Sequence, residues 1–589
     1  WFRRINPVIP TQTRSDASFR PPAWFRAALF DALVFILAGG VLLLARPERR
    51  VALLQNYAAA FFLALIGLLL WLKNRRVTEA NDASHPSIFP PALLLLLPAL
   101  VFLPALGTYF VSDDFEHLQL ARLPLLPFIG QQLTRGQVTG SGYHLFFRPL
   151  GFASLFLDYR LFHYWAPGYH LVNLALHLVV VAGVYFLTLA LLSSPDSACW
   201  PGSSTRAGVG GAPSPDTQTA LMAAALFSVA PVTVQPVTYI AARFDLIATA
   251  LGVWALVLYL RFRKSGSASA YALALLFFFM ATFAKESVYV LPLLLMWLEL
   301  MLMRGRNWKA VAGFLAVAVA TFIYRWRVLH GIAGYQAPGG SPAVLGLGRK
   351  AFIAVFLRAP AETLLGYNWH QPPAGRVVAI AAATTAVLLS LLFISRPGRR
   401  RLAWFALGWI VIAVLPAHFL LWTADPALLW SRVLYISAIG AAILLATLLS
   451  GVAEVRLRRV WTSLLLICFL LGTWHNLSAW RSNSRITRQF LSALARLQPS
   501  PPRGSEFIIA GMPIELCGVR FFLTGLTPAV QLAYGRPDLT ARRPFDPALR
   551  PKAPAIDLRW TGQPPDFIAP AQNSPTNTIP TNPSPPSCN

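Results

Sequence analysis

Repeated apolar runs long enough to cross a membrane are the feature that most constrains this chain. An α-helical span needs roughly 17 to 25 mostly apolar residues. The sequence predicts about thirteen spans, at 24–45, 51–72, 88–110, 168–192, 219–236, 245–262, 270–285, 288–303, 309–330, 377–395, 402–422, 433–450 and 460–475. Only 12% of the residues are charged, about half the fraction in soluble domains. We therefore expect an all-α polytopic membrane protein.

The loop charges predict the orientation of the spans. Clusters of Lys and Arg at 261–264, 304–309, 396–401 and 456–459 all fall between spans on the same side. Positively charged loops face the cytoplasm, so the opposite loops and the C-terminus are expected outside. Arg46 would also fall outside, against this rule. The excess of 50 Lys and Arg over 23 Asp and Glu is thereby explained by orientation, and no nucleic-acid partner is expected.

The chain divides into four predicted parts. Residues 1–87 form a cytoplasmic arm with two extra spans, and residues 88–480 form the main membrane domain, with a large outer loop at 111–167. Residues 481–560 are predicted to be a small extracytoplasmic α/β module, because Phe507 to Ala510 reads as a strand that precedes a Gly-Met-Pro turn. Residues 561–589 form a proline-rich tail that is expected to be disordered.

An acidic segment at the mouth of the third span is the strongest candidate for chemistry. Asp113, Asp114 and Glu116 lie within four residues of one another, and acids near a membrane are costly unless they are solvated or functional. Neighbouring side chains point in different directions, so one aspartate is expected to face a substrate, with a slight preference for Asp113. Two alternatives stay open: a solvated helix cap, and a metal site that also uses His117.

His170, Asn173 and His177 have the spacing i, i+3, i+7, which places them on one face of a helix. A polar stripe on a membrane helix faces a wet cavity or the interior of the bundle. The stripe therefore predicts either substrate contact, for which His170 is the better candidate, or hydrogen bonds between helices.

Three motifs in and after the outer loop carry a family resemblance. They are Arg-Pro-Leu at 148–150, Leu-Asp-Tyr at 157–159 and Gly-Tyr-His-Leu-Val-Asn-Leu-Ala-Leu-His at 168–177. Together with the acidic pair, they resemble the membrane glycosyltransferases of the GT-C fold, and especially the bacterial and TPR-bearing O-mannosyltransferase-like proteins. The resemblance covers about 88–480 and lacks the TPR arm. It implies polyprenyl-phosphate sugar donors and a catalytic aspartate in the first large outer loop, here Asp113 or Asp114.

Further segments match the same family. In a second motif, Ala230 and Gln235 replace the histidine and glutamate of the family pattern, whereas Arg243 and Asp245 are retained. The resemblance implies that the substrate-binding residues are Arg148, His170, Arg243, Lys285, Arg432 and Tyr435. Each cation also has a structural alternative: a local Arg243–Asp245 pair, a Lys285–Glu286 pair, or arginines that snorkel at the membrane surface.

These observations predict a glycosyltransferase that moves a sugar from a polyprenyl-phosphate donor to an acceptor hydroxyl. The acceptor is a protein, a lipid or a glycan, and we expect the active site on the outer face of a bacterial inner membrane. No metal ligand is assigned, and a divalent cation is the one cofactor left open. The alternatives are a flippase for lipid-linked sugars and a non-catalytic assembly protein. A transporter favours charges at mid-membrane depth, whereas the acids here crowd the span ends.

Overall fold

The computed structural model of the chain describes the outer-loop region, most of the predicted membrane domain and most of the C-terminal segment. The described residues are 89–139, 144–193, 215–332, 334–335, 341–365, 397–421, 430–451, 455–516, 518–522, 524–544, 546, 554–561 and 567–568. The predicted arm, the spans at 24–45, 51–72 and 377–395, and nearly all of the tail lie outside these residues.

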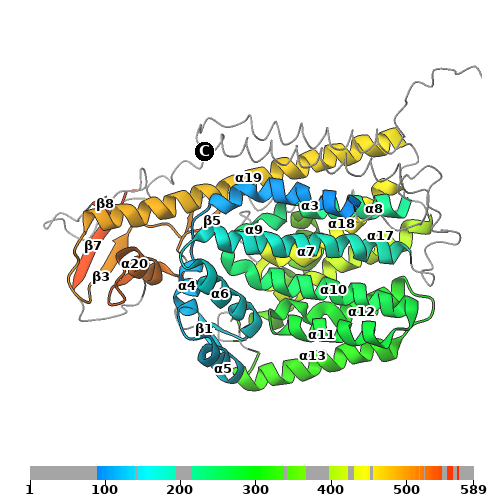
Figure 1. The fold of residues 1–589 in the computed structure, drawn as a ribbon, viewed down its shortest axis with the longest axis horizontal. Coiled ribbons are helices and arrows are strands. Elements are labelled where there is room, and N and C mark those ends of the chain that lie inside the picture. Colours follow the sequence, from blue (N-terminus) through cyan, green and yellow to red (C-terminus); the bar gives the residue numbers. More distant parts are fainter. Residues whose placement is uncertain are drawn as a thin grey trace, which may run out of the picture.

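A bundle of long, roughly parallel helices fills most of the molecule (Figure 1). Every predicted span within the described residues coincides with a helix, alone or with a short extension. The bundle helices are α3 (Phe89–Phe102), α7 (Ala166–Leu192), α8 (Pro215–Ser228), α10 (Arg243–Ser265), α11 (Ala268–Thr282), α12 (Leu291–Met301), α13 (Trp308–Leu329), α17 (Pro397–Val414), α18 (Tyr435–Ser450) and α19 (Val455–Leu497).

Short helices continue several of these at one end of the bundle. They are η1 (Leu103–Gly107), η2 (Pro231–Thr233), α9 (Val234–Thr238), η3 (Ile240–Ala242), η4 (Glu286–Val290), η7 (Leu415–Leu421) and η8 (Ser431–Leu434). Prolines open or interrupt four of them, because proline lacks the amide hydrogen that a continuing α-helix needs. The broken backbone at this end leaves polar groups available to form a site.

Six of the described helices are long and apolar enough to cross a membrane, or seven if the bent pair Asp216–Ser228 and Pro231–Thr238 is one span. Two shorter apolar helices accompany them. The helical membrane class predicted from the sequence is therefore confirmed. The predicted total of about thirteen spans includes three that lie outside the described residues.

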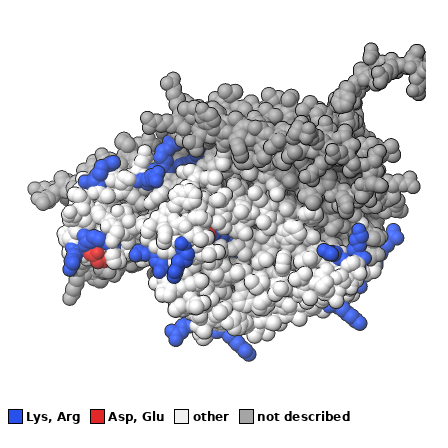
Figure 2. All heavy atoms as spheres, in the orientation of Figure 1, with Lys and Arg blue, Asp and Glu red and all other residues white. Residues whose placement is uncertain are grey.

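The bundle has a buried centre and an apolar outer surface. The apolar windows of the α10 and α18 spans are each 78% buried, whereas that of α13 is only 33% buried. Large apolar side chains such as Leu276 on α11 and Val319 on α13 are exposed at mid-helix. Figure 2 shows few charged side chains on the visible face between the basic groups at its two ends. An apolar belt with charged rims is the pattern that lipid contact requires.

The two ends of the bundle differ in their polar contacts. At one end, which we call the basic end, Arg263 pairs with Glu299, Arg399 hydrogen-bonds Thr219, and Arg458 reaches Gln218. These arginines belong to the predicted cytoplasmic loops at 261–264, 396–401 and 456–459, whose described parts lie at this end. The other end, which we call the acidic end, holds Asp113 and the helix starts that follow the predicted outer loops. The grouping of loops predicted from their charges is thus reproduced by the packing.

The predicted outer loop folds as a small layer over the acidic end (Figure 1). It consists of α4 (Asp114–Ala121), α5 (Leu125–Arg135), β1 (Gln137–Thr139), β2 (His144–Phe146) and α6 (Pro149–Phe162). The two strands pair antiparallel. Phe128 of α5 packs against Phe152 and Phe156 of α6, so the layer has an aromatic core.

A second surface segment follows α13. It contains η5 (Ala343–Leu345), α14 (Arg349–Ile353), the π-helical turn η6 (Ala354–Arg358) and α15 (Ala359–Leu365). Phe352 and Phe356 are exposed on one side, whereas Ala351 and Val355 are buried on the other. The segment is therefore amphipathic, which suits a position at a membrane surface.

The C-terminal segment forms a sheet at the far end of α19, which is continuous through residue 480 (Figure 1). The sheet order is β6-β3-β7-β8, with β3 parallel to β6 and β7, and β7 antiparallel to β8. Its strands are β3 (Glu506–Ala510), β6 (Thr540–Arg542), β7 (Ala555–Trp560) and β8 (Phe567–Ile568); the hairpin β4 (Glu515–Leu516) and β5 (Val519–Arg520) and the helix α20 (Leu526–Tyr534) complete it. We call residues 498–568 the C-terminal module. Its extracytoplasmic location stays a prediction.

The orientation in the membrane can be tested with two matched glycines. Gly348 and Gly305 are both exposed, and an added Cβ would meet nothing within 4 Å at either position. In a background whose four cysteines are replaced by serine, we expect Gly348→Cys to react with an impermeant thiol reagent on intact cells. Gly305→Cys, near the basic end, should react only after permeabilisation. The reverse pattern would place Asp113 in the cytoplasm.

Candidate active site

Asp114 links the acidic segment to the bundle through hydrogen bonds with backbone amides. Its Oδ2 accepts a hydrogen bond from the Val111 amide at 3.0 Å, and its Oδ1 accepts one from the Ala241 amide at 2.9 Å. The residue is 1% exposed. Burial raises the pKa of the Asp114 carboxyl to about 8, although the two amide donors act in the opposite direction. Both oxygens are occupied by backbone, so the contacts of Asp114 indicate a structural role.

Asp113 has a different environment. Its Oδ1 accepts hydrogen bonds from the Thr524 hydroxyl at 2.6 Å and from the Ser112 hydroxyl at 3.0 Å. Burial acts to raise the pKa of Asp113, but the Thr524 hydrogen bond, the Arg432 guanidinium, the Tyr239 hydroxyl and His117 together hold that pKa below its ordinary value. The carboxylate is therefore ionised at neutral pH, which a general base requires.

The hydrogen bonds at the start of α4 show whether Asp113 is a helix cap. Asp113 is the residue before α4, yet its side chain forms no capping hydrogen bond. The preceding Ser112 has φ = 47°, a left-handed conformation that is uncommon for residues other than glycine. Such backbone strain is common at functional sites, and the Asp113 side chain bonds the Thr524 and Ser112 hydroxyls in place of its own helix.

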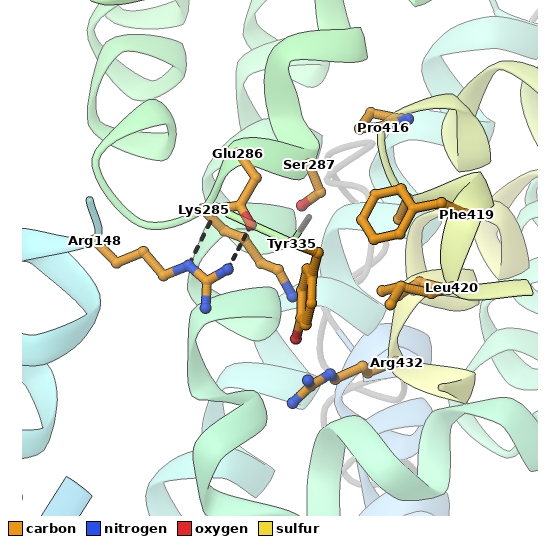
Figure 3. A pocket seen from close by; sticks show the side chains of 11 residues that line it. Arg148, Lys285, Glu286, Ser287, Tyr335, Pro416, Phe419, Leu420 and Arg432 are labelled. Carbon is orange, nitrogen blue, oxygen red and sulfur yellow. Dashed lines mark hydrogen bonds and ion pairs between the residues drawn. The ribbon is translucent and has the colours of Figure 1, made fainter. Parts of the chain in front are cut away.

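A cleft opens beside this segment at the acidic end, between the outer loop, η4, η7 and η8 (Figure 3). Its polar wall contains Arg148, Lys285, Glu286, Tyr335 and Arg432. Its other wall is apolar and includes Phe419 and Leu420 of η7. Figure 3 shows the ends of the Arg148, Lys285 and Arg432 side chains pointing toward a common space near the Tyr335 hydroxyl. A cleft with cations on one side and apolar groups on the other suits a lipid that carries an anionic head.

Two of the three cations in the cleft have carboxylate partners. Arg148 Nε donates to Glu286 at 3.1 Å, and Lys285 Nζ lies 2.5 Å from Asp245 Oδ1. These contacts differ from the two local pairs considered from the sequence, Arg243–Asp245 and Lys285–Glu286. In the structure, Lys285 pairs with Asp245 and Glu286 pairs with Arg148. These pairs hold the cations at fixed positions on the wall.

Arg432 is the exception. Its guanidinium forms no ion pair with any described residue, and its Nε is buried without a hydrogen-bond partner. It lies over the rings of Tyr239 and Trp430, at 5.7 and 5.4 Å from their centroids. The backbone amide of Arg432 donates to Gln235 Oε1 at 2.8 Å. A guanidinium that is positioned but unpaired is suited to bind a phosphate.

Arg243 lies away from the cleft in a buried network. Its guanidinium donates to Asp158 Oδ2 at 2.5 Å, to Asn173 Oδ1 at 2.5 Å and to the Tyr169 carbonyl at 2.8 Å. The side chain is fully buried. Arg243 therefore joins α10 to α6 and α7, and these contacts favour the structural alternative over substrate binding.

The polar stripe of α7 faces the bundle interior. His170 Nε2 lies 2.8 Å from the Thr108 hydroxyl, and His177 Nδ1 lies 2.7 Å from the Tyr435 hydroxyl. The His177 Nε2 approaches the Ser228 carbonyl at 3.0 Å. His170 and Tyr435 do not line the cleft; His170 bonds the segment that follows η1, and Tyr435 bonds α7. Their predicted roles as substrate ligands receive no support from these positions.

A metal site at the acidic segment is the second alternative left open by the sequence. Within the described residues, no group of three or more His, Cys, Asp or Glu side chains is arranged to hold a metal ion. The His117 ring instead bonds through Nδ1 to the Asp113 carbonyl at 2.7 Å.

Several residues at the site were not singled out from the sequence. Tyr335 and Thr524 belong to no motif, and Tyr239 occupies an unspecified position within the second motif. Thr524 lies 411 residues from its partner Asp113. Gln235 was noted only as a departure from the family pattern, yet it holds the backbone of Arg432. That departure was the one available signal, because a buried amide at a motif position needs a hydrogen-bond partner.

The chain is similar to known proteins in sequence and in structure. No family model matches the chain. A protein O-mannosyl-transferase from Caenorhabditis elegans is 27% identical over 177 residues, or 29% of this chain, and the chain spans only 23% of that relative's length. This similarity confirms the resemblance to O-mannosyltransferases read from the motifs.

Two solved structures of ArnT from Cupriavidus metallidurans are also similar. The form bound to undecaprenyl phosphate has a TM-score of 0.41 at 11% identity, over 80% of this chain and 92% of that one. The apo form has a TM-score of 0.29 at 14% identity, over 76% and 85% of the two chains.

The structural role of Arg243 leads to a stability prediction. Arg243→Gln would leave Asp158 buried without its cation, and breaking a buried pair costs about 3–5 kcal/mol. We expect a marked fall in the thermal unfolding midpoint of the detergent-purified protein. Arg160→Gln is the control, since Arg160 is an exposed arginine on the same loop helix, α6, and it should leave the midpoint near that of the parent. Equal midpoints for the two variants would show that the network does not hold the loop.

Proposed function

We propose that this chain is a GT-C glycosyltransferase that moves a sugar from a polyprenyl-phosphate donor to an acceptor hydroxyl. The observation that carries the proposal is the cleft at the acidic end. Arg148, Lys285 and Arg432 converge there, and Arg432 connects the cleft to the ionised Asp113. A positive wall and a base side by side are the two components that this transfer needs.

The donor already contains its leaving group. A sugar linked to a phosphate departs when the bond between its anomeric carbon and the phosphate oxygen breaks, and cations stabilise the negative charge that develops there. Arg432, with no carboxylate partner among the described residues, is assigned to the phosphate, with Lys285 and Arg148 beside it. The apolar wall formed by Phe419 and Leu420 faces the first isoprene units of the lipid.

Asp113 is assigned as the general base. It takes the proton of the acceptor hydroxyl as the acceptor oxygen bonds to the anomeric carbon, and the polyprenyl phosphate leaves with the electron pair of the broken bond. This single displacement inverts the anomeric configuration. Asp114 is less suited to this role, because backbone amides hold both of its oxygens and burial raises its pKa to about 8, so the carboxyl is largely protonated at neutral pH.

The acceptor and the location follow from the resemblance. The similar protein from Caenorhabditis elegans is named a protein O-mannosyl-transferase, which supports a hydroxyl acceptor and makes mannose the first sugar to test. The orientation of the loops supports an active site on the outer face of a plasma membrane. There, lipid-borne sugars are the available donors.

The direct test of the function uses detergent-purified protein and a panel of radiolabelled polyprenyl-phosphate sugars. Transfer or slow hydrolysis of at least one donor is expected, with polyprenyl phosphate as the released product. Free polyprenyl-phosphate sugar translocated across proteoliposomes without cleavage would identify a flippase instead. Neither cleavage nor translocation of any donor would favour a non-catalytic assembly protein.

The phosphate contact makes Arg432 sensitive to charge. Arg432→Ala should weaken donor binding or turnover by about 10- to 100-fold, because an interaction with a charged group contributes about 1.5–3 kcal/mol. Arg432→Lys should retain much of the activity. Arg327→Ala is the matched control, since Arg327 is an exposed arginine near the same end of the bundle, on α13. Parental activity in Arg432→Ala would show that this residue only anchors the chain at the interface.

The two aspartates should respond differently to amide substitution. Asp113→Asn keeps the shape but removes the basicity, so transfer should fall by about 10²-fold or more while donor binding and the unfolding midpoint stay near parental values. In Asp114→Asn, the amide NH₂ would face a backbone N–H, so the unfolding midpoint should fall. Measurement of both properties for both variants separates the roles. Parental transfer in Asp113→Asn would remove it as the base.

A further inference from the structure

The C-terminal module contacts the acidic segment directly through one turn. Four residues define what we call the docking turn: Phe521, Phe522, Thr524 and Gly525. The Thr524 hydroxyl donates to Asp113 Oδ1 at 2.6 Å, and the ring of Phe522 stacks on that of Phe115, with their centroids 5.8 Å apart. The turn is thus in contact with the proposed base and with the helix that follows it.

The approach of the two backbones is very close. Gly525 has φ = +80°, and a Cβ at this position would lie 2.3 Å from the Ser112 carbonyl oxygen. Glycine satisfies both requirements, because it tolerates positive φ and has no Cβ. Ser112 is the strained residue immediately before Asp113. The docking turn therefore packs directly against the backbone that leads into the proposed base.

Other residues of the C-terminal module hold the docking turn in place. Arg543 Nη2 donates to the Phe522 carbonyl at 2.7 Å and to the Phe521 carbonyl at 3.3 Å. Phe521 stacks on Trp560 at the end of β7. On the membrane side, Phe110 and Phe115 belong to the same buried cluster as Phe507 and Phe522. The module and the outer loop therefore share one hydrophobic core, which fixes the turn against the acidic segment.

We propose that Thr524 is a positioning residue for Asp113, and that the C-terminal module completes the catalytic site by docking this turn on it. The inference rests on the proposed function for the identity of Asp113 as the base. The Thr524 hydroxyl fixes the Oδ1 oxygen of the Asp113 carboxylate, the group that receives the acceptor proton. The remaining charged and titratable groups that face Asp113 are Arg432, His117, Tyr239 and Asp114.

The first test is a pH–rate profile of donor turnover. A base acts only when it is unprotonated, and a hydrogen bond to a carboxylate favours its ionised form. Thr524→Val removes the donor with little change in shape, so the acidic limb of the profile should move up by about one pH unit, with kcat lowered and KM for the donor near the parental value. Thr524→Ser restores a hydroxyl and should restore the parental limb.

A purely structural role for Thr524 gives a different result. In that case Thr524→Val lowers the unfolding midpoint or the yield, while the folded fraction keeps the parental acidic limb. An unmoved limb in folded Thr524→Val would overturn the proposal.

Two glycines provide a second test that does not depend on the hydroxyl. Gly525 and Gly535 flank α20, and both have positive φ. An added Cβ would meet nothing within 4 Å at Gly535, so Gly535→Ala carries the backbone penalty without the clash. Gly525→Ala should lower kcat by about 10-fold or more relative to Gly535→Ala, with donor binding retained in both. Equal turnover in the two variants would show that the close approach to Ser112 has no part in catalysis.

The contact can also be tested without enzymatic activity. In the cysteine-free background, Asp113→Cys and Thr524→Cys are combined, and a protease site is inserted within 194–214. A short bis-thiosulfonate reagent should then join the two fragments of the cleaved protein on a non-reducing gel. Asp113→Cys paired with Arg503→Cys, an exposed position in the same module, should give separate fragments.

The outcomes of this test separate the two proposals. Joined fragments together with an inactive parent protein would retain the docked turn and reject the glycosyltransferase function. Separate fragments from an active protein would reject the docked turn alone.

Discussion

A charge that is buried at the end of an apolar bundle needs a partner of opposite charge. The ion pair of Arg243 is the contact on which the structure of the acidic end depends. Its fully buried guanidinium joins α10 to Asp158 on α6 and to Asn173 on α7. A guanidinium left unpaired in this position would destabilise the fold by several kcal/mol, so the outer loop must lie where Asp158 can reach it. Asp114 adds a second tie, because it bonds the amides of Val111 and Ala241. The loop that holds Asp113 is therefore fixed before any substrate arrives.

Ion pairing distinguishes charged side chains that have a structural role from those that are available to bind a ligand. Arg243, Lys285 and Arg148 each have a carboxylate partner, in Asp158, Asp245 and Glu286. Arg432 has none among the described residues, and Asp113 is bonded by hydroxyl groups rather than by a cation. Arg432 lines the cleft and contributes to the low pKa of the nearby Asp113, so we assign this pair of charges to a ligand. Their proximity is consistent with a phosphate bound on one side and a hydroxyl deprotonated on the other.

Much of this arrangement could be predicted from the sequence. The apolar runs predicted the positions of the helices, and the loop charges predicted which helix ends lie together. The motifs indicated that Arg148, Lys285 and Arg432 belong to the same site as the acidic pair. The roles of Asp113 and Asp114 could not be separated, because they depend on amides from a segment far along the chain, at Ala241. The pairing of Lys285 with Asp245 was hidden for the same reason. Thr524 carried no signal, since a lone threonine in a C-terminal segment has no pattern that links it to a loop 411 residues away.

A cryo-EM structure of the protein with polyprenyl phosphate would show directly whether the cleft binds the donor's phosphate beside Asp113. We expect phosphate density in contact with the Arg432 guanidinium and facing Lys285 and Arg148, with the lipid leaving along Phe419 and Leu420. Asp113 should stay bonded to Thr524 on the side of the phosphate where an acceptor would enter. Density for the phosphate at the basic end, or in a site that Arg432 does not line, would show that the cleft is not the donor site.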